Sequence, residues 1–491
     1  MRLAGIDLGT SAARVALSGD EGVRVLSLSA PARPTGASAC PDADALFGAE
    51  LSLLETGGPI SAAVLAVGAD KDPAERAALR DAAHRHGLTR VRLVAAPVAA
   101  ALASVRQGGV SGRLLVLDLG ETGLSVALLS VNLPRVDVIG LAHTDEVGGQ
   151  RLDQVVAAQL AELAGPDATP ELRRAAATAA RGARHDLTDH FEARITLEVT
   201  GTPRRVVKLS RDQFEQRARS LFARAEPTIR GVLSEALLRP EDLDHVLLVG
   251  GCASMPLARR FATEVTGRRV RVPEVPETWA AVGAALYGQA LWGGAEPLLL
   301  TPALSHGIWV AGLQDAADLL LPRNCALPAH AICSRPADLE LRLEGESGAQ
   351  GAEQSTGAQP LFLRAAVEGC GDAPIEWTVT ADSDGILTAE PSPWPEGWRP
   401  DAAPGALAPS PEATARQRVT LRAALAAQIA LVGRLGARGD TLREMPFAAI
   451  GAALDAGDVA TARAGIAGVD DALTRLALAG IAPRTETSPG D

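Results

Sequence analysis

The sequence predicts an α/β domain of two similar lobes, followed by a small β-rich domain and a helical tail. Between residues 61 and 106, two apolar strands alternate with two helices, which is the pattern of an α/β sheet. A buried strand that ends in Asp and runs into a Gly turn occurs at Asp7 and again at Asp118, which indicates two related lobes. Residues 303–395 contain short alternating runs split by Gly, Pro and Asp, a composition typical of a β-sandwich.

The other predicted elements follow in chain order. Residues 1–28 predict three strands, residues 30–60 predict loops with a short helix, and residues 114–141 predict three more strands. We then expect helices at 149–187, 210–238 and 277–292, with strands at 193–199, 204–209 and 245–251. The expected domains are therefore the α/β domain at 1–293, a linker at 294–302, the β-sandwich at 303–395, a proline-rich spacer at 396–411 and a helical segment at 412–480.

Composition excludes several classes of partner. A net charge of −12 without a dense Lys/Arg run argues against nucleic acid. No window reaches the roughly 18 consecutive apolar residues of a membrane span, so we expect no membrane partner. Five cysteines without CxxC spacing fit reduced thiols, and we expect a cytoplasmic protein.

Three Gly-containing turns after buried strands carry the chemistry, at 7–11, 118–120 and 250–251. Glycine lets backbone N–H groups approach an anion closely, so such turns can cradle phosphate. A carboxylate at a strand end suits hydrated Mg²⁺. One turn alone is equally well explained as a tight hairpin. Three in this order favour a polyphosphate clamped between Asp7 and Asp118.

These motifs, in this order, resemble those of the heat shock protein 70 family. GIDLGTS and VLDLGETGLSVALLSV look like its two phosphate motifs, EVGGQRLD like the Gly-Gly turn of the next lobe, and VLLVGGCASMP like its adenosine motif. LLLTPALSHGI resembles the interdomain linker, and VTADSDGILTAE resembles a landmark of the substrate-binding β-domain. The resemblance implies an actin-like (ribonuclease H-like) two-lobed ATPase domain, a small β-sandwich and a short C-terminal helical segment.

The resemblance also implies roles for individual residues. Asp7 and Asp118 would bind Mg²⁺ through water and, with Thr10, form the catalytic set. The nucleotide, ATP or ADP, would be contacted by two further groups. The phosphates, ribose and adenosine would meet Gly9, Thr10, Ser11, Gly120, Gly148, Gly149, Gly250 and Gly251. Arg184 and Thr188 fall near the adenine, where the family has Lys and Ser.

Departures from the family pattern are concentrated in the same motifs. Ala96 stands where the family has its water-orienting glutamate, and the stretch 30–60 is too short for the lobe that carries a catalytic lysine. Ser254 replaces an adenine-stacking arginine, and Gly68 replaces a proline proposed as a switch. Glu121 replaces a glycine of the second phosphate motif; it is either a surface carboxylate or a replacement acid near the attacking water.

We therefore expect a chaperone that binds ATP or ADP with weak or absent hydrolysis and takes unfolded or extended peptide segments in its β-domain. Co-chaperones are further expected partners. The alternative is a non-hydrolysing scaffold or regulator that keeps the architecture for partner binding. The helices at 412–480 either pack on themselves and their neighbour or, as in the family, form a lid.

Overall fold

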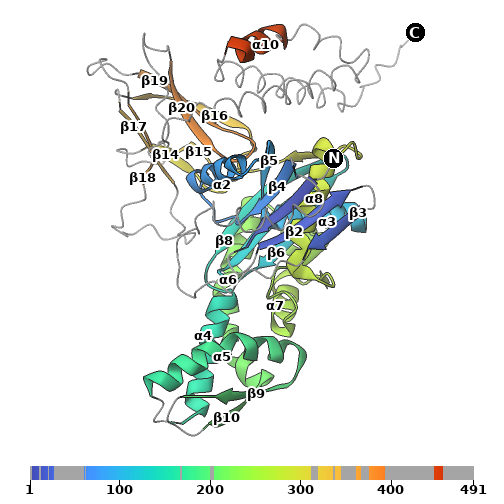
Figure 1. Ribbon diagram of the computed structural model, residues 1–491, viewed down its shortest axis with the longest axis vertical. Helices are drawn as coiled ribbons and strands as arrows, with labels where there is room; N and C mark the ends of the chain where they lie inside the picture. Colours follow the sequence, from blue (N-terminus) through green and yellow to red (C-terminus); the bar gives the residue numbers. More distant parts are fainter. Residues whose placement is uncertain are drawn as a thin grey trace. The chain divides into compact units, whose positions relative to one another are not determined.

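The computed structural model describes residues 3–9, 13–19, 22–26, 60, 62–165, 169–199, 204–310, 319–335, 338–343, 361–366, 375–392 and 447–456 (Figure 1). Residues 1–400 and 401–491 form two compact units. In the second unit the described element is helix α10 (Phe447–Ala456). None of the described helices is long and apolar enough to span a membrane.

The first lobe is a five-stranded sheet in the order β3-β2-β1-β4-β5. Strands β1, β2 and β3 are antiparallel, whereas β4 and β5 run parallel to β1. Helix α2 packs against β5. The elements are β1 (Leu3–Leu8), β2 (Ala13–Gly19), β3 (Gly22–Leu26), β4 (Ala62–Val67), α2 (Pro73–Arg85) and β5 (Arg90–Ala95).

The second lobe repeats this topology, which confirms the prediction of two similar lobes. Its sheet has the order β12-β11-β6-β7-β8-β13. The strands β8-β7-β6-β11-β12 correspond in order to β3-β2-β1-β4-β5 of the first lobe, and β13 is an additional strand beside β8. The strands are β6 (Gly112–Leu119), β7 (Leu124–Asn132), β8 (Arg135–Thr144), β11 (His245–Val249), β12 (Val270–Arg271) and β13 (Leu299–Thr301).

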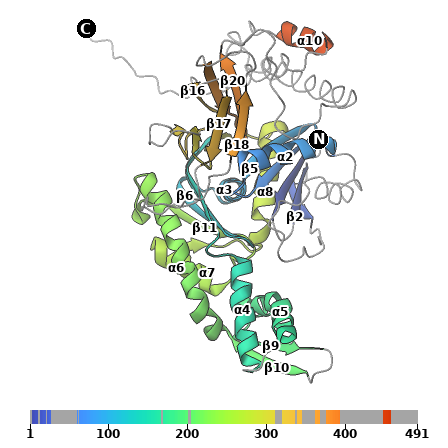
Figure 2. The same cartoon turned by 90° about the vertical axis from the view of Figure 1, so that its left-hand side faces the viewer.

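The outer face of the second lobe is covered by helices, and a hairpin of β9 and β10 lies beyond them (Figure 2). Capping boxes fix helix starts at Asp72 in the first lobe and at Ser210 here, each closed by the side chain three residues on. The elements are α4 (Gly149–Leu163), α5 (Pro170–Asp189), β9 (Glu192–Leu197), β10 (Arg205–Ser210), α6 (Arg211–Glu235), the 3-10 turn η2 (Pro240–Asp242) and α7 (Pro256–Thr266).

Two helices join the lobes. Helix α3 (Ala96–Gly108) packs on β6 and β7 of the second lobe. Helix α8 (Trp279–Trp292), which follows the 3-10 turn η3 (Pro276–Thr278), packs on β1, β2 and β4 of the first lobe. The two helices also pack on each other. A β-carbon at Gly283 would lie 1.7 Å from the Ala99 carbonyl oxygen, so α3 and α8 are in backbone contact. The relation between the lobes is therefore set by a close helix–helix contact.

The described residues within 303–395 form two antiparallel sheets around one core. Their orders are β15-β14-β17-β18 and β16-β19-β20, and Trp377, Ile308 and Leu341 are fully buried between them. The strands are β14 (Ile308–Val310), β15 (Leu319–Leu321), β16 (Ala329–Arg335), β17 (Asp338–Leu343), β18 (Leu361–Ala366), β19 (Ile375–Ala381) and β20 (Leu387–Ser392). We call this part the β-domain.

The β-domain contacts both lobes. On the first lobe, Arg80 of α2 donates to Asp382 at 2.9 Å and the Leu93 N–H of β5 donates to Asp384 at 3.1 Å. On the second lobe, Asn324 donates to Glu235 at 2.9 Å. The interface is thus made of directed polar contacts at two places.

The predicted linker contains a sheet strand. Leu299–Thr301, as β13, pairs in parallel with Arg135–Asp137 of β8, and the Leu298 side chain is 5% exposed. An apolar segment gains free energy by leaving water, which accounts for this docking. Residues 30–59 of the segment predicted at 30–60, the spacer predicted at 396–411, and the helical segment predicted at 412–480 apart from 447–456 lie outside the described residues.

Candidate functional site

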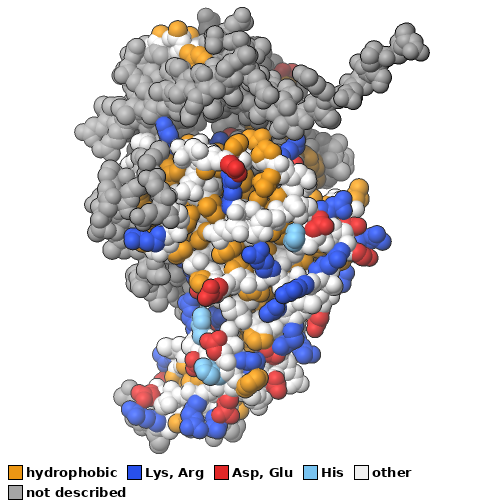
Figure 3. All heavy atoms as spheres, turned by 90° about the vertical axis from the view of Figure 1, so that its right-hand side faces the viewer, with side chains coloured by type: hydrophobic (Ala, Val, Ile, Leu, Met, Phe, Trp, Pro, Cys, Tyr) orange, Lys and Arg blue, Asp and Glu red, His pale blue; other side chains and the backbone are white. Residues whose placement is uncertain are grey.

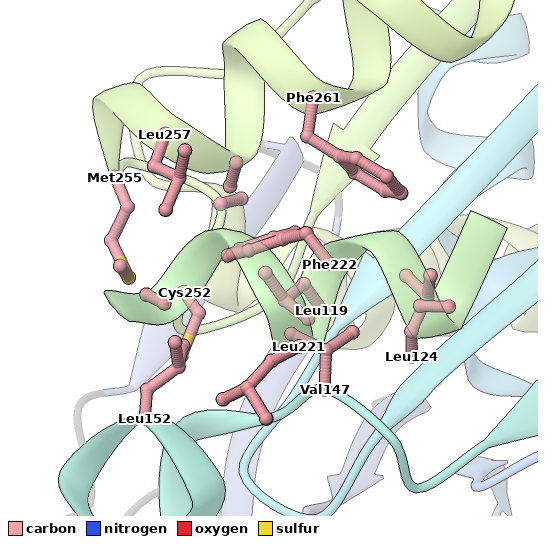
Figure 4. Close-up of a cluster of buried hydrophobic side chains, with 14 of the residues drawn as sticks. Leu119, Leu124, Val147, Leu152, Leu221, Phe222, Cys252, Met255, Leu257 and Phe261 are labelled. Atoms are coloured by element: carbon pink, nitrogen blue, oxygen red, sulfur yellow. The ribbon is translucent and has the colours of Figure 1, made fainter. Parts of the chain in front are cut away.

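Three glycine turns of the second lobe meet over one hydrophobic core. Leu119 precedes Gly120, Val147 precedes Gly148, and Cys252 follows Gly251; Figure 4 shows these three side chains directed into the same cluster. The backbones are also joined, because the Gly149 N–H donates to Gly120 O at 2.9 Å and the Cys252 N–H donates to Leu119 O at 3.1 Å. The core therefore brings together turns that are far apart in the sequence.

Two of these glycines are required by packing. Gly250 has φ +94°, and a β-carbon there would lie 2.4 Å from Leu119 O and 2.5 Å from Asp118 Oδ1. A β-carbon at Gly148 would lie 2.7 Å from the Gly123 nitrogen. Gly148 and Gly250 thus hold the turns together.

Other glycines leave open space. A β-carbon at Gly251 would meet no heavy atom within 4 Å, and at Gly120 the nearest atom would be Gly123 O at 3.7 Å. Within the described residues, the N–H groups of Glu121 and Thr122 donate to no protein acceptor. A turn with open space and available N–H groups suits an anion. Gly9 ends the described part of the first-lobe turn, and Thr10 and Ser11 lie outside the described residues.

The two predicted carboxylates lie at the ends of their central strands. Asp7, on β1, is 9% exposed. Asp118 lies on β6, and protein encloses its carboxyl group although the residue keeps some contact with solvent. This enclosure raises the pKa of Asp118 to about 6, and the charge of Arg14 opposes the rise. Asp7 pairs with the same Arg14, Oδ2 to Nη1, at 3.8 Å.

The predicted adenine-side donors are engaged by protein groups. Arg184 is 2% exposed; its Nε donates to Asp153 at 2.6 Å and its Nη1 contacts the Cys252 sulfur at 3.4 Å. Thr188 donates its hydroxyl to the Arg184 carbonyl at 3.2 Å. Burial raises the pKa of the Cys252 thiol to about 11 although Arg184 opposes it. This region is an internal polar cluster in the structure.

Glu121 belongs to the same cluster. Its carboxylate would lie 2.6 Å from a β-carbon at Gly149, and it pairs with Arg181 at 3.6 Å. The Glu121 side chain is half-buried and paired, so it is not a free surface carboxylate; its role as a replacement acid stays a prediction. Arg181 and Arg184 lie one turn of α5 apart, so that helix presents two cations here.

A second polar cluster was not predicted. Ser125 bonds His143 Nδ1 at 3.0 Å across β7 and β8, and His143 would lie 2.5 Å from a β-carbon at Gly123. Burial would raise the pKa of Asp70, but His143 and Lys71 outweigh it and hold that pKa below its usual range. Ser125 and His143 border the turn at residues 120–123. Ala96, at the start of α3, is 7% exposed and adds no carboxylate.

Taken by residue type, the site fits the phosphate part of a nucleotide. The Gly120 and Gly251 turns are open, and two strand-end carboxylates offer oxygen atoms of the kind that hydrated Mg²⁺ takes. The adenine side fits less directly, because Arg184 is already paired with Asp153.

Comparison with known proteins agrees with these features. The model of the family "Hsp70 protein" matches residues 49–335, more than half of the chain. Three similar proteins, each named "Chaperone protein HscA homolog", are from Acidithiobacillus ferrooxidans (29% identical over 343 residues), Variovorax paradoxus (30% over 347) and Vibrio cholerae (29% over 356). The matches cover 67%, 67% and 69% of this chain and 55%, 55% and 56% of those proteins. The chain thus spans about half the length of the curated relatives it matches.

Proposed function

Because the chain belongs to the heat shock protein 70 family, we propose that it is a chaperone whose residues 1–293 bind ATP or ADP between the two lobes. Family membership and the two mixed sheets establish the actin-like, two-lobed ATPase fold. The observation that carries the proposal is the convergence of open glycine turns beside Asp118, with Asp7 at the matching position of the first lobe.

In this proposal each residue has a defined role. The N–H groups of the turns at Gly9, Gly120 and Gly251 hold the phosphates, and Thr10 and Ser11 add hydroxyl groups. Asp7 and Asp118 hold Mg²⁺ through water; the ion, when bound, neutralises phosphate charge. Gly148, Gly149 and Gly250 keep the turns close together, and Arg184 and Thr188 border the adenine.

Calorimetric titration of ADP and ATP into the full chain tests this site. Asp7→Ala and Asp118→Ala should each weaken binding at least about tenfold, since a lost charged partner costs more than 1.4 kcal/mol. Asp81→Ala, which removes an exposed carboxylate of α2, should leave binding unchanged. Absence of nucleotide affinity in the unchanged chain at millimolar concentration would reject the proposal.

Hydrolysis should be slow. Each missing preorganised group, the water-orienting glutamate and the catalytic lysine, removes on the order of 2–4 kcal/mol of transition-state stabilisation. Ala96→Glu restores a carboxylate at the first turn of α3 and should raise the single-turnover rate. A rate for the unchanged chain equal to that of an ordinary family member would contradict this argument and direct attention to Glu121, through Glu121→Gln.

For the remaining chain we propose that the β-domain, residues 303–395, is a β-sandwich that takes extended apolar peptide segments and that residues 412–480 form a helical segment. We also propose a cytoplasmic location, and co-chaperones as partners. Fluorescence anisotropy of a labelled apolar peptide, compared with a polar peptide of equal length, tests the substrate class. Equal binding of both peptides would reject it.

A non-hydrolysing scaffold is the second candidate. Two observations favour it: Arg184 is satisfied by Asp153 within the protein, and the β-domain is bound to both lobes through Asp384 and Asn324. A scaffold would bind its partner equally well with and without nucleotide. The calorimetric result above separates the two candidates.

A further inference from the structure

A cavity of about 510 Å³ lies at the amino ends of β6 and β11, beside the outer strand β12 of the second-lobe sheet. The strands β6 and β11 run parallel, with His245 beside Leu114 at this end and Val249 beside Asp118 at the other. The phosphate turns therefore lie at the opposite end of the same two strands, roughly 13 Å away at about 3.3 Å per residue. The cavity is a separate place from the proposed nucleotide site.

Three arginines line this cavity. Arg259 lies near the start of α7, and Arg269 and Arg271 flank the buried Val270 at β12. Because side chains alternate along an extended strand, Arg269 and Arg271 lie on the side opposite to Val270. A β-carbon at Gly108 would lie 2.5 Å from Arg271 Nη1, so this guanidinium lies over the last residue of α3.

The three guanidinium groups make no hydrogen bond or ion pair with another described residue, and the three residues are exposed. Neighbouring arginines are paired: Arg260 with Glu215, and Arg268 with the Pro240 carbonyl at 3.3 Å. Figure 3 views the side on which α7 lies in Figure 1 and shows blue side chains gathered there. In a chain of net charge −12, unpaired cations around one cavity create a local positive potential.

The rest of the lining is aliphatic, with few polar groups. Asp244 is the one carboxylate among the described lining residues, and its Oδ2 accepts the Arg113 N–H at 2.7 Å. Ser104 Oγ accepts the Trp279 Nε1–H at 3.1 Å. A cavity of this size with apolar walls and a few polar groups is the usual form of a small-molecule site. The buried aliphatic residues are Val110, Leu114, Val246, Leu247 and Val270.

We propose that this cavity is a second ligand site, which binds a small phosphate-bearing molecule with an apolar part. A guanidinium is always charged and offers a planar fork of donors that matches phosphate oxygens. A phosphate group presents oxygens in several directions, so Arg259, Arg269 and Arg271 can share it, whereas a planar carboxylate occupies one fork. The aliphatic floor takes the apolar part of the ligand.

Calorimetric titration of phenyl phosphate into the full chain tests the site. The titration is made in EDTA, so that no Mg²⁺ joins the probe to Asp7 and Asp118. Arg259→Ala and Arg271→Ala should each weaken binding at least about tenfold, because each removes a charged hydrogen-bond donor. Arg219→Ala removes an exposed arginine of α6 outside the cavity and, as the matched control, should bind as the unchanged chain does.

Two further probes test the ligand class. Phenyl phosphate should bind at least about threefold more tightly than inorganic phosphate, because only phenyl phosphate buries apolar surface on the aliphatic floor. It should bind at least about tenfold more tightly than benzoate, whose carboxylate engages fewer donors. Affinity equal to that of inorganic phosphate would overturn the apolar part of the proposal, and affinity equal to that of benzoate would overturn the phosphate part.

The location of the ligand has its own readout. Phenyl phosphate should slow hydrogen exchange in the peptide covering Val270–Arg271 of the unchanged chain, and unaltered exchange there overturns the proposal. Equal affinity of the unchanged chain, Arg259→Ala and Arg271→Ala also overturns it, as does the absence of binding at millimolar phenyl phosphate. The exchange result on the unchanged chain decides even if a variant does not fold.

Discussion

Asp384 holds the β-domain on the first lobe, and replacing it with Asn should loosen that contact. The carboxylate is 3% exposed and lies 3.6 Å from Arg80 and 3.6 Å from Arg92. It also accepts the Leu93 N–H, an amide of the edge strand β5. Burial raises the pKa of Asp384 above its usual range, and the two arginines and this N–H oppose that rise.

The magnitude follows from these distances. Asn keeps the shape and the acceptor oxygen of Asp384 but removes its charge. At an effective dielectric constant of 20, a charge pair at 3.6 Å is worth about 4–5 kcal/mol before desolvation. Arg80 and Arg92 are 27% and 36% exposed, so solvent screens part of this energy. We expect a net loss of about 2–4 kcal/mol, which is about 30- to 1000-fold in the docking equilibrium.

Hydrogen exchange of the full chain is the assay. In Asp384→Asn the peptide covering Arg90–Ala95 should exchange faster, because undocking leaves the edge strand open to water. Glu390→Gln removes an exposed carboxylate of β20 and is the matched control. If Asp384→Asn exchanges at this peptide no faster than the control, the interface is not held by the charge and the reasoning is refuted.

Three further predictions concern the core, the thiol and the linker. Gly283→Ala should destabilise the chain by at least about 2 kcal/mol, because the new methyl group would collide with the backbone of α3. Gly288→Ala should cost nothing, because the nearest atom to its new β-carbon would be Val64 Cγ2 at 3.5 Å. Thermal unfolding compares the stabilities of the two variants. Cys252 should be alkylated at pH 8 about 100-fold more slowly than an ordinary thiol, because its pKa is about 11. Peptide mapping compares its alkylation rate with that of the half-buried Cys333, and equal rates would contradict the prediction. Residues 294–302 should resist protease equally in ATP and in ADP, and a clear difference between the nucleotides would refute this.

The repeated lobes could be predicted because their signals are local. A buried strand, an Asp at its end and a Gly turn fit within about ten residues, and they recur at Asp7 and Asp118. Strand β13 could not be predicted in this way, because its partner Arg135–Asp137 lies in a distant part of the chain and three residues carry too little pattern.

The site residues show the same division. Arg14 could have been found, because a symmetric β1–β2 hairpin already pairs it with Asp7. The Ser125–His143 contact could not. Counting back from the pair Asn132–Arg135 would place Ser125 opposite Ala142, but an irregularity between Leu128 and Leu129 shifts the register by one residue. Such a bulge exchanges the residues on each face and leaves no clear mark in the sequence.

The contacts that dock the β-domain and β13 bear on how nucleotide can act here. The docking groups, Asp384 with the arginines and β13 with β8, include none of the residues of the phosphate turns. A ligand shifts an equilibrium only by its differential affinity for the two states. Against docking contacts of about 2–4 kcal/mol, nucleotide would need to favour the undocked state by about 30- to 1000-fold. Gly68 stands where the family has a proline proposed as a switch, and Ala96 stands where it has a water-orienting glutamate, so few groups remain that could generate such a difference in affinity. The docked arrangement should therefore persist in ATP, in ADP and without nucleotide.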